Sequence, residues 1–98
     1  MASIPEDEMA KEWSLDPSAP ELLRDQLVSL IKAELRSGKL APRTKLTPSI
    51  QMADELGVSR STVTEAMGLL REEGLVRFVP GRGIFTAEPD VIAEWKRS

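Results

Sequence analysis

The chain has 98 residues and a formal net charge of −3, and it contains no histidine and no cysteine. Its length and composition are those of one small soluble domain, and no apolar run could span a bilayer. The missing residue types exclude disulfides, histidine-based catalysis and the usual zinc sites, so we expect neither an enzyme nor a cofactor. Residues 6–8 are acidic, unlike the start of a secretory signal, so a cytoplasmic protein with no membrane partner is expected.

The first part of the chain predicts an arm, a linker and a helix. Residues 1–15 fit either a short helix or a disordered arm, and the proline-rich residues 16–20 indicate an extended linker. A helix is predicted over residues 21–37, with Pro20 suited to its first turn and Gly38 to its end. Its apolar stripe consists of Leu23, Leu27, Leu30, Ile31 and Leu35.

Two further helices are predicted in the middle of the chain. Residues 44–46 favour a short strand, after which Thr47 is typical of an N-cap with Pro48 at the first helical position. The helix that follows ends at about Leu56, and the next helix covers residues 60–73. The spacing of apolar residues predicts which side chains face the core. In the first helix they are Met52, Ala53 and Leu56, and in the second they are Val63, Ala66, Met67 and Leu70.

The turn between these two helices is typical of a helix-turn-helix. Gly57 suits the left-handed conformation that ends a helix, and the Ser59 hydroxyl can cap the next helix by accepting a backbone N–H. Helices joined by so short a turn cross steeply, which can present the second helix to a DNA major groove.

A β-hairpin is predicted after the third helix. Residues 75–79 and 84–86 favour strands, and the basic, glycine-rich tip between them is residues 80–83. Three helices followed by such a hairpin make a winged helix-turn-helix, a mainly α fold with a small β-wing. A last short helix is predicted over residues 91–96. We divide the chain into an arm and linker (1–19), a DNA-binding domain (20–87) and a short tail or helix (88–98).

The charge of the chain is divided unevenly along its length. Residues 1–26 hold seven acidic and two basic side chains, whereas residues 36–82 hold eight basic and five acidic ones. Positive charge therefore gathers in the part of the chain that would face DNA phosphates.

Several segments of the chain form a known pattern in order: Ile31 with residues 37–42, then residues 53–63, 66–70, 73–76 and 81–85. Together they resemble the N-terminal DNA-binding domain of the GntR family of bacterial transcription regulators, from about Pro20 to Thr86. The resemblance implies a winged helix that binds double-stranded DNA to control transcription. The sequence departs from the family at Ile50 and Thr64, where arginines are usual, and at Ile84, which is usually threonine.

The family usually carries a large effector domain after the wing, and no such domain lies in this chain. Only twelve residues follow Thr86. The sequence therefore fits either a naturally short regulator or a domain of a longer one.

Candidate DNA-contacting residues lie in the predicted recognition helix, in the hairpin and before the second helix. Arg60 is expected to pair with guanine or with a phosphate, and Arg82 to reach a narrow minor groove. The whole set is Arg43, Lys45, Ser49, Ser59, Arg60, Ser61, Thr62, Thr64, Arg77, Gly81, Arg82 and Gly83. The alternatives are solvated charges for the basic residues, a cap for Ser59 and turn geometry for Gly81 and Gly83.

These observations predict a sequence-specific DNA-binding regulator that occupies a palindromic operator as a homodimer. The terminal segments, which contain Trp13 and Trp95, are expected to pair the subunits, since neither segment is needed for a winged-helix core. Alternatively, each tryptophan fills the core locally. The competing function is a winged helix that binds another protein and binds DNA weakly or not at all.

Overall fold

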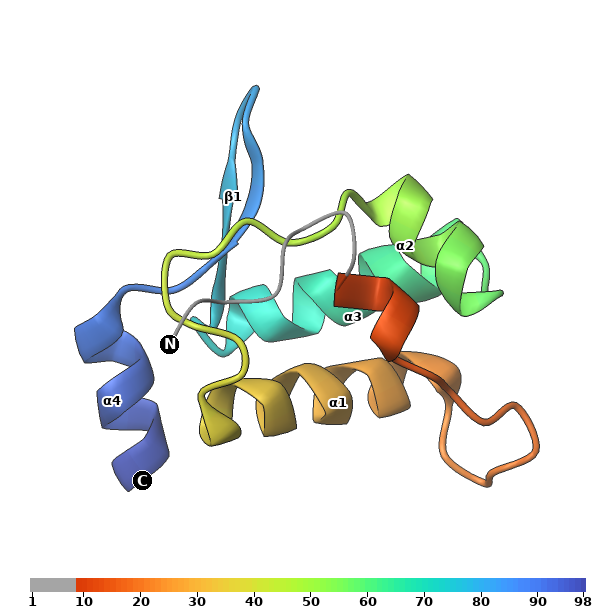
Figure 1. Cartoon of the computed structure of the whole chain (residues 1–98), viewed down its shortest axis with the longest axis horizontal. Coiled ribbons are helices and arrows are strands. Elements are labelled where there is room, and N and C mark those ends of the chain that lie inside the picture. Colours follow the sequence, from red (N-terminus) through yellow and green to blue (C-terminus); the bar gives the residue numbers. More distant parts are fainter. Residues whose placement is uncertain (1–8) are drawn as a thin grey trace.

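The computed structural model describes residues 9–98 as a winged helix-turn-helix, which confirms the predicted fold (Figure 1). In chain order the elements are η1 (Met9–Glu12), α1 (Leu23–Ser37), α2 (Ser49–Leu56), α3 (Arg60–Glu72), β1 (Val76–Val79), β2 (Gly83–Thr86) and α4 (Pro89–Arg97). The hairpin of β1 and β2 projects from the helical body, and α4 lies at the far end of the molecule from α2.

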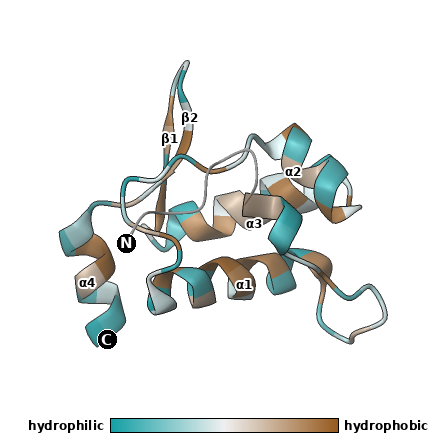
Figure 2. Ribbon diagram, in the orientation of Figure 1, coloured by the Kyte–Doolittle hydropathy of each residue, from teal (hydrophilic) through white to brown (hydrophobic). Residues whose placement is uncertain are grey.

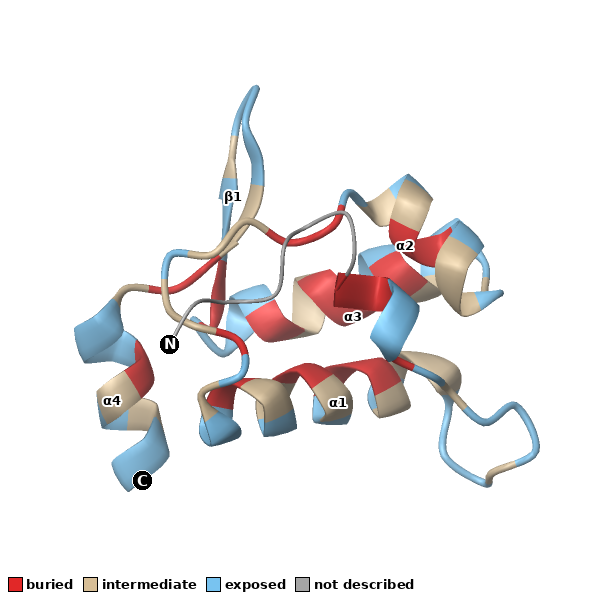
Figure 3. Ribbon diagram, in the orientation of Figure 1, coloured by how far each residue is buried: buried red, intermediate tan, exposed pale blue. Residues whose placement is uncertain are grey.

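The core forms where α1 packs along α3. Both helices carry hydrophobic and hydrophilic residues in alternating bands, as amphipathic helices do (Figure 2). The buried side of α1 faces α3 (Figure 3). The fully buried side chains at this contact include Leu27, Ile31, Val63 and Leu70. Each such side chain stabilises the fold by about 1.5–3 kcal/mol relative to its exposed form.

The N-terminal segment completes this core, which corrects the expectation that neither terminal segment is needed there. Met9 and Ala10 are fully buried, and Trp13 is 6% exposed. The Trp13 indole Nε1 donates a hydrogen bond of 2.9 Å to Glu34 Oε1 of α1. In the sequence these apolar side chains stand among acidic residues, which are typical of an exposed segment. The helix η1 has only four residues, so hydrophobic periodicity could not predict it. The part of the predicted arm over residues 1–8 lies outside the described residues.

The helix α1 begins at Leu23, so the prediction of a start at residue 21 with Pro20 in the first turn is wrong. The Gln26 carboxamide binds the preceding loop instead: it donates to the carbonyls of Asp16 and Glu21 and accepts from the Asp16 N–H. The Ser18 hydroxyl and backbone N–H both donate to the Asp16 carboxylate and lower its pKa.

The helix α2 also begins later than predicted. Pro48 is its N-cap rather than its first residue, because the Pro48 carbonyl, on an extended backbone, accepts from the Met52 N–H at 2.8 Å. Thr47 is thus one residue too early to be the cap, and it is buried. Of the predicted inward residues of α2, Met52 and Ala53 are buried and Leu56 is partly buried.

The turn between α2 and α3 has the predicted geometry. Gly57 ends α2 in the left-handed region, at φ 69°. Ser59 caps α3, and its Oγ accepts a hydrogen bond of 3.1 Å from the Thr62 N–H. The helix α3 ends at Glu72 and buries Val63 and the other residues predicted for its inner face.

In the wing, β1 and β2 pair antiparallel, with Val76 opposite Thr86 and Val79 opposite Gly83. The strand predicted over residues 44–46 is reduced to an isolated bridge between Lys45 and Phe85. The helix α4 is longer than predicted. It buries Ile92, and its Trp95 is half-buried beneath the Arg36 guanidinium, 4.1 Å from the ring centroid.

The two tryptophans provide a matched pair for testing this core. We predict that Trp13→Ala lowers the free energy of unfolding by about 3–5 kcal/mol, because it opens a cavity under η1. Trp95→Ala removes a half-buried side chain and a cation–π contact, so it should cost only about 2 kcal/mol. Urea denaturation followed by circular dichroism measures both. Equal losses would contradict a core role for the N-terminal segment.

Candidate nucleic-acid interface

The side of α3 opposite the core is uncovered. Val63, Ala66, Met67 and Leu70 are buried, whereas Arg60, Ser61, Thr64 and Glu65 are exposed. A single amphipathic helix therefore presents a polar face about two turns long, and a duplex major groove is wide enough to admit it.

Arg60 is placed to read that groove. It is the first residue of α3, directly after the cap, and it is exposed. Within residues 9–98 its guanidinium has no ion pair, so its five N–H donors can turn to an outside partner. A guanine edge or a phosphate is such a partner.

The hydroxyls near the start of α3 fall into two groups. Ser59 and Thr62 are engaged with each other, since Ser59 Oγ lies 2.9 Å from Thr62 Oγ1 and also accepts from the Thr62 N–H. This confirms the capping role that was the alternative for Ser59. Ser61 and Thr64 are exposed on the outer face.

The wing carries Arg82 at its tip. Gly81 and Gly83 flank it with φ of 75° and 125°, a left-handed backbone that glycine adopts without strain. Gly83 also packs closely on a neighbouring segment, since a Cβ there would lie 3.1 Å from Lys45 Cε. The turn-geometry alternative thus describes both glycines, and Arg82 itself is exposed.

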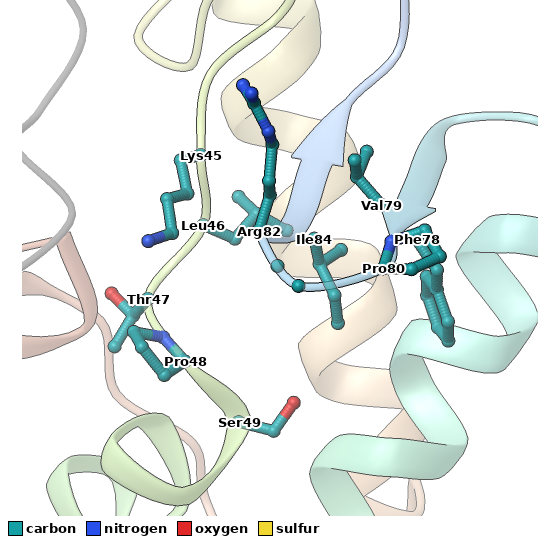
Figure 4. A pocket seen from close by; sticks show the side chains of 12 residues that line it. Lys45, Leu46, Thr47, Pro48, Ser49, Phe78, Val79, Pro80, Arg82 and Ile84 are labelled. Carbon is teal, nitrogen blue, oxygen red and sulfur yellow. The ribbon is translucent and has the colours of Figure 1, made fainter.

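A groove separates the wing from the start of α2. Figure 4 shows Lys45, Pro48 and Ser49 along one side and Phe78, Pro80 and Ile84 along the other. Ser49 is the first residue of α2 and is half-buried. The groove therefore brings two of the predicted contact residues, Lys45 and Ser49, next to the hairpin.

The wing is fixed to α3 by a contact that the sequence analysis missed. The Arg71 guanidinium of α3 stacks on the Phe78 ring of β1, 4.6 Å from its centroid. Alternation along the hairpin could have placed Phe78 on the helix side of the wing. The stack sets the position of the hairpin relative to the exposed face of α3.

Glu88 is a second residue that the sequence analysis missed. Its carboxylate accepts from Arg77 at 2.7 Å and from Arg43 at 2.5 Å, so one acid at the start of α4 holds two predicted phosphate contacts. Arg43 has φ 58°, a conformation that costs a non-glycine residue about 1 kcal/mol, and its N–H donates to the Ala87 carbonyl. Arg43, Arg77 and Arg82 line the same shallow hollow on the wing.

Glu65 is the acidic residue nearest the middle of the outer face of α3. Arg24 of α1 donates to Glu65 at 3.2 Å and offsets its charge. Ile50, at the family's usual arginine position, is 54% exposed. No helix within residues 9–98 is long and apolar enough to cross a membrane, and the same residues hold no group of side chains suited to a metal ion.

Comparison with known proteins agrees with this geometry. The model of the bacterial regulatory proteins of the gntR family matches residues 23–86, which span α1 through the end of the wing. The chain belongs to the GntR family. Its match covers the helices and the hairpin that position the candidate interface.

Relatives within the GntR family extend beyond the length of this chain. The transcriptional repressor NagR of Bacillus subtilis is 30% identical over 76 residues, which are 78% of this chain and 31% of NagR. The chain thus spans about a third of that relative.

Solved structures with the same fold include two with more than a quarter of their residues identical to this chain. The DNA-binding domain of AraR in complex with operator ORX1 is 30% identical, with a TM-score of 0.66 over 76% of this chain and 95% of that one. A GntR-family regulator from Listeria monocytogenes is 26% identical, with a TM-score of 0.73 over 85% of this chain and 71% of that one.

The cap of α3 can be tested without DNA. Ser59→Ala should lower the free energy of unfolding by about 1 kcal/mol, because the Thr62 N–H loses its acceptor, and Ser59→Asp should restore most of that loss. Ser61→Ala, on the exposed face of α3, is the matched control and should not lower the free energy of unfolding. Urea titration measures all three, and a loss with Asp as large as that with Ala would show that Ser59 does not act as a cap.

Proposed function

We propose that this chain is the DNA-binding domain of a transcription regulator and binds double-stranded DNA sequence-specifically. The observation that carries the proposal is the uncovered polar face of α3, which begins at Arg60 and lies beside a basic wing. The AraR DNA-binding domain, solved with operator DNA, supports it by its likeness in sequence and fold. Such a domain would act at the bacterial chromosome, in the nucleoid.

The candidate residues take three roles in this proposal. Arg60 and Thr64 read base edges in the major groove together with Ser61. Arg82 enters the minor groove from its glycine-flanked tip. Phosphate contacts come from the groove and the outer wing, namely from Arg43, Lys45, Ser49 and Arg77, and from the capped start of α3 at Ser59 and Thr62.

We further propose that two copies occupy a palindromic site. One recognition helix and one wing read only a few base pairs, and two-fold pairing doubles the site. Trp13 is taken up in the core, so its side chain is not a pairing surface. The helix α4 is therefore the terminal segment that remains for pairing the two copies. Its Val91 is exposed and its Trp95 is half-buried.

The proposal is tested by selecting a binding site from randomised duplexes and measuring affinity for it. Arg60→Ala should weaken binding by about 1–3 kcal/mol and relax the preference at one base pair, with the circular dichroism spectrum unchanged. Lys39→Ala, at an exposed residue just after α1, is a control with the same change in charge. If no duplex is selected and the affinity for DNA does not fall with salt, the protein-binding alternative is favoured instead.

The ion pairs of Glu88 generate a separate prediction about affinity. DNA phosphates must compete with the Glu88 carboxylate for Arg43 and Arg77. Glu88→Gln should therefore strengthen binding and steepen the logarithmic salt dependence by about 0.9 for each additional phosphate that the released arginines neutralise.

Glu94→Gln is the matched control for Glu88→Gln. It makes the same change in charge on α4, where Glu94 pairs with Arg97 rather than with the wing. Fluorescence anisotropy at several salt concentrations compares the two variants. Equal effects would mean that Glu88 acts only through net charge.

A further inference from the structure

Gly68 lies in the interior of α3, where glycine weakens a helix because its unfolded chain has the most freedom to lose. The chain contains six glycines. The other five all have positive φ, between 69° and 125°, and thus occupy conformations that favour glycine. Gly68 has no such conformation, so its backbone does not explain its presence.

The packing of the fold does not explain it either. A Cβ built on Gly68 meets no heavy atom within 4 Å. Alanine would therefore fit there without any shift and would make α3 a better helix. Neither the backbone conformation nor the packing of residues 9–98 requires a glycine at this position.

Gly68 faces away from the core. It follows Thr64 by four residues and Ser61 by seven, so the three lie along one line of the helix. Val63 and Met67 bury the opposite side. Gly68 is half-buried and lies close to the middle of the uncovered face, on the other side of that middle from Glu65, which Arg24 of α1 reaches.

We infer that Gly68 lets α3 settle closer to the base edges of the DNA major groove than any side chain there would permit. The inference rests on the proposed DNA-binding function. A helix with its side chains is about 10–12 Å across and the groove about 12 Å wide, so one added side chain on the leading face is felt. The middle of that face points to the floor of the groove, where the base edges lie, and its flanks point to the phosphate walls.

The test compares Gly68→Ala and Gly68→Gln with the intact chain on the selected duplex. Both variants should fold, and Gly68→Ala should raise Tm by about 4–8 °C through its higher helix propensity. Affinity should nevertheless fall about tenfold for alanine, as expected of overpacking, and further for glutamine. The salt dependence should not change, because no charge is altered.

Ser29→Ala is the matched control. Ser29 is exposed on α1, so its substitution raises helix propensity away from the interface. It should raise Tm and leave the affinity for DNA unchanged. Any loss of affinity with Ser29→Ala would mean that stability itself reduces binding, and the inference would be overturned.

The sequence preference of the variants shows whether Gly68 faces the base edges on the floor of the groove or the phosphates of its walls. Repeating the selection with Gly68→Ala should change the preferred bases at one or two positions. If the affinity instead fell equally for all DNA sequences, Gly68 would lie against the phosphates, and the inferred contact with base edges would be overturned. Wild-type affinity of Gly68→Ala would overturn the inference alone, whereas a wild-type chain that selects no duplex would overturn the proposed function.

Discussion

The packing of α1 along the inner side of α3 is the contact on which the rest of the structure depends. Leu27 and Ile31 from one helix and Val63 and Leu70 from the other are buried there. Because an α-helix has a fixed angular repeat, burying one side of α3 determines which residues face outward. The candidate interface is therefore a consequence of the core.

Two local features, a capped turn and a side-chain stack, position the elements around α3. The left-handed turn at Gly57 and the cap at Ser59 determine where α3 begins, so Arg60 emerges at its exposed end. At the other end of α3, the stack of Arg71 on Phe78 positions the wing. These contacts hold the helix and the hairpin in one arrangement before DNA is bound, which lowers the entropy that binding must lose.

The sequence predicted those parts that follow from local rules. Helical spacing identified the buried side of α3, and Gly57 with Ser59 identified the turn. Parts that depend on distant partners could not be predicted in this way. The Trp13 indole finds its hydrogen-bond acceptor in Glu34, twenty-one residues later, and the start of α1 depends on the Gln26 carboxamide binding a loop ten residues earlier.

The same distinction holds at the interface. Candidate residues were found by residue type and by resemblance, whereas their partners were not. Arg43 and Arg77 come from separate segments of the chain, but Glu88 joins them. Nothing in the sequence pairs an acid at the start of α4 with two arginines from different segments, since that contact exists only when the wing is folded.

The central claim is that α3 and the wing together form the surface that meets DNA. The most direct measurement is an NMR titration of the 15N-labelled chain with its selected duplex. Shift changes should concentrate at the start and outer face of α3 and at the wing tip near Arg82. Changes confined to α4 or to the outer side of α1, with α3 unaffected, would contradict the account.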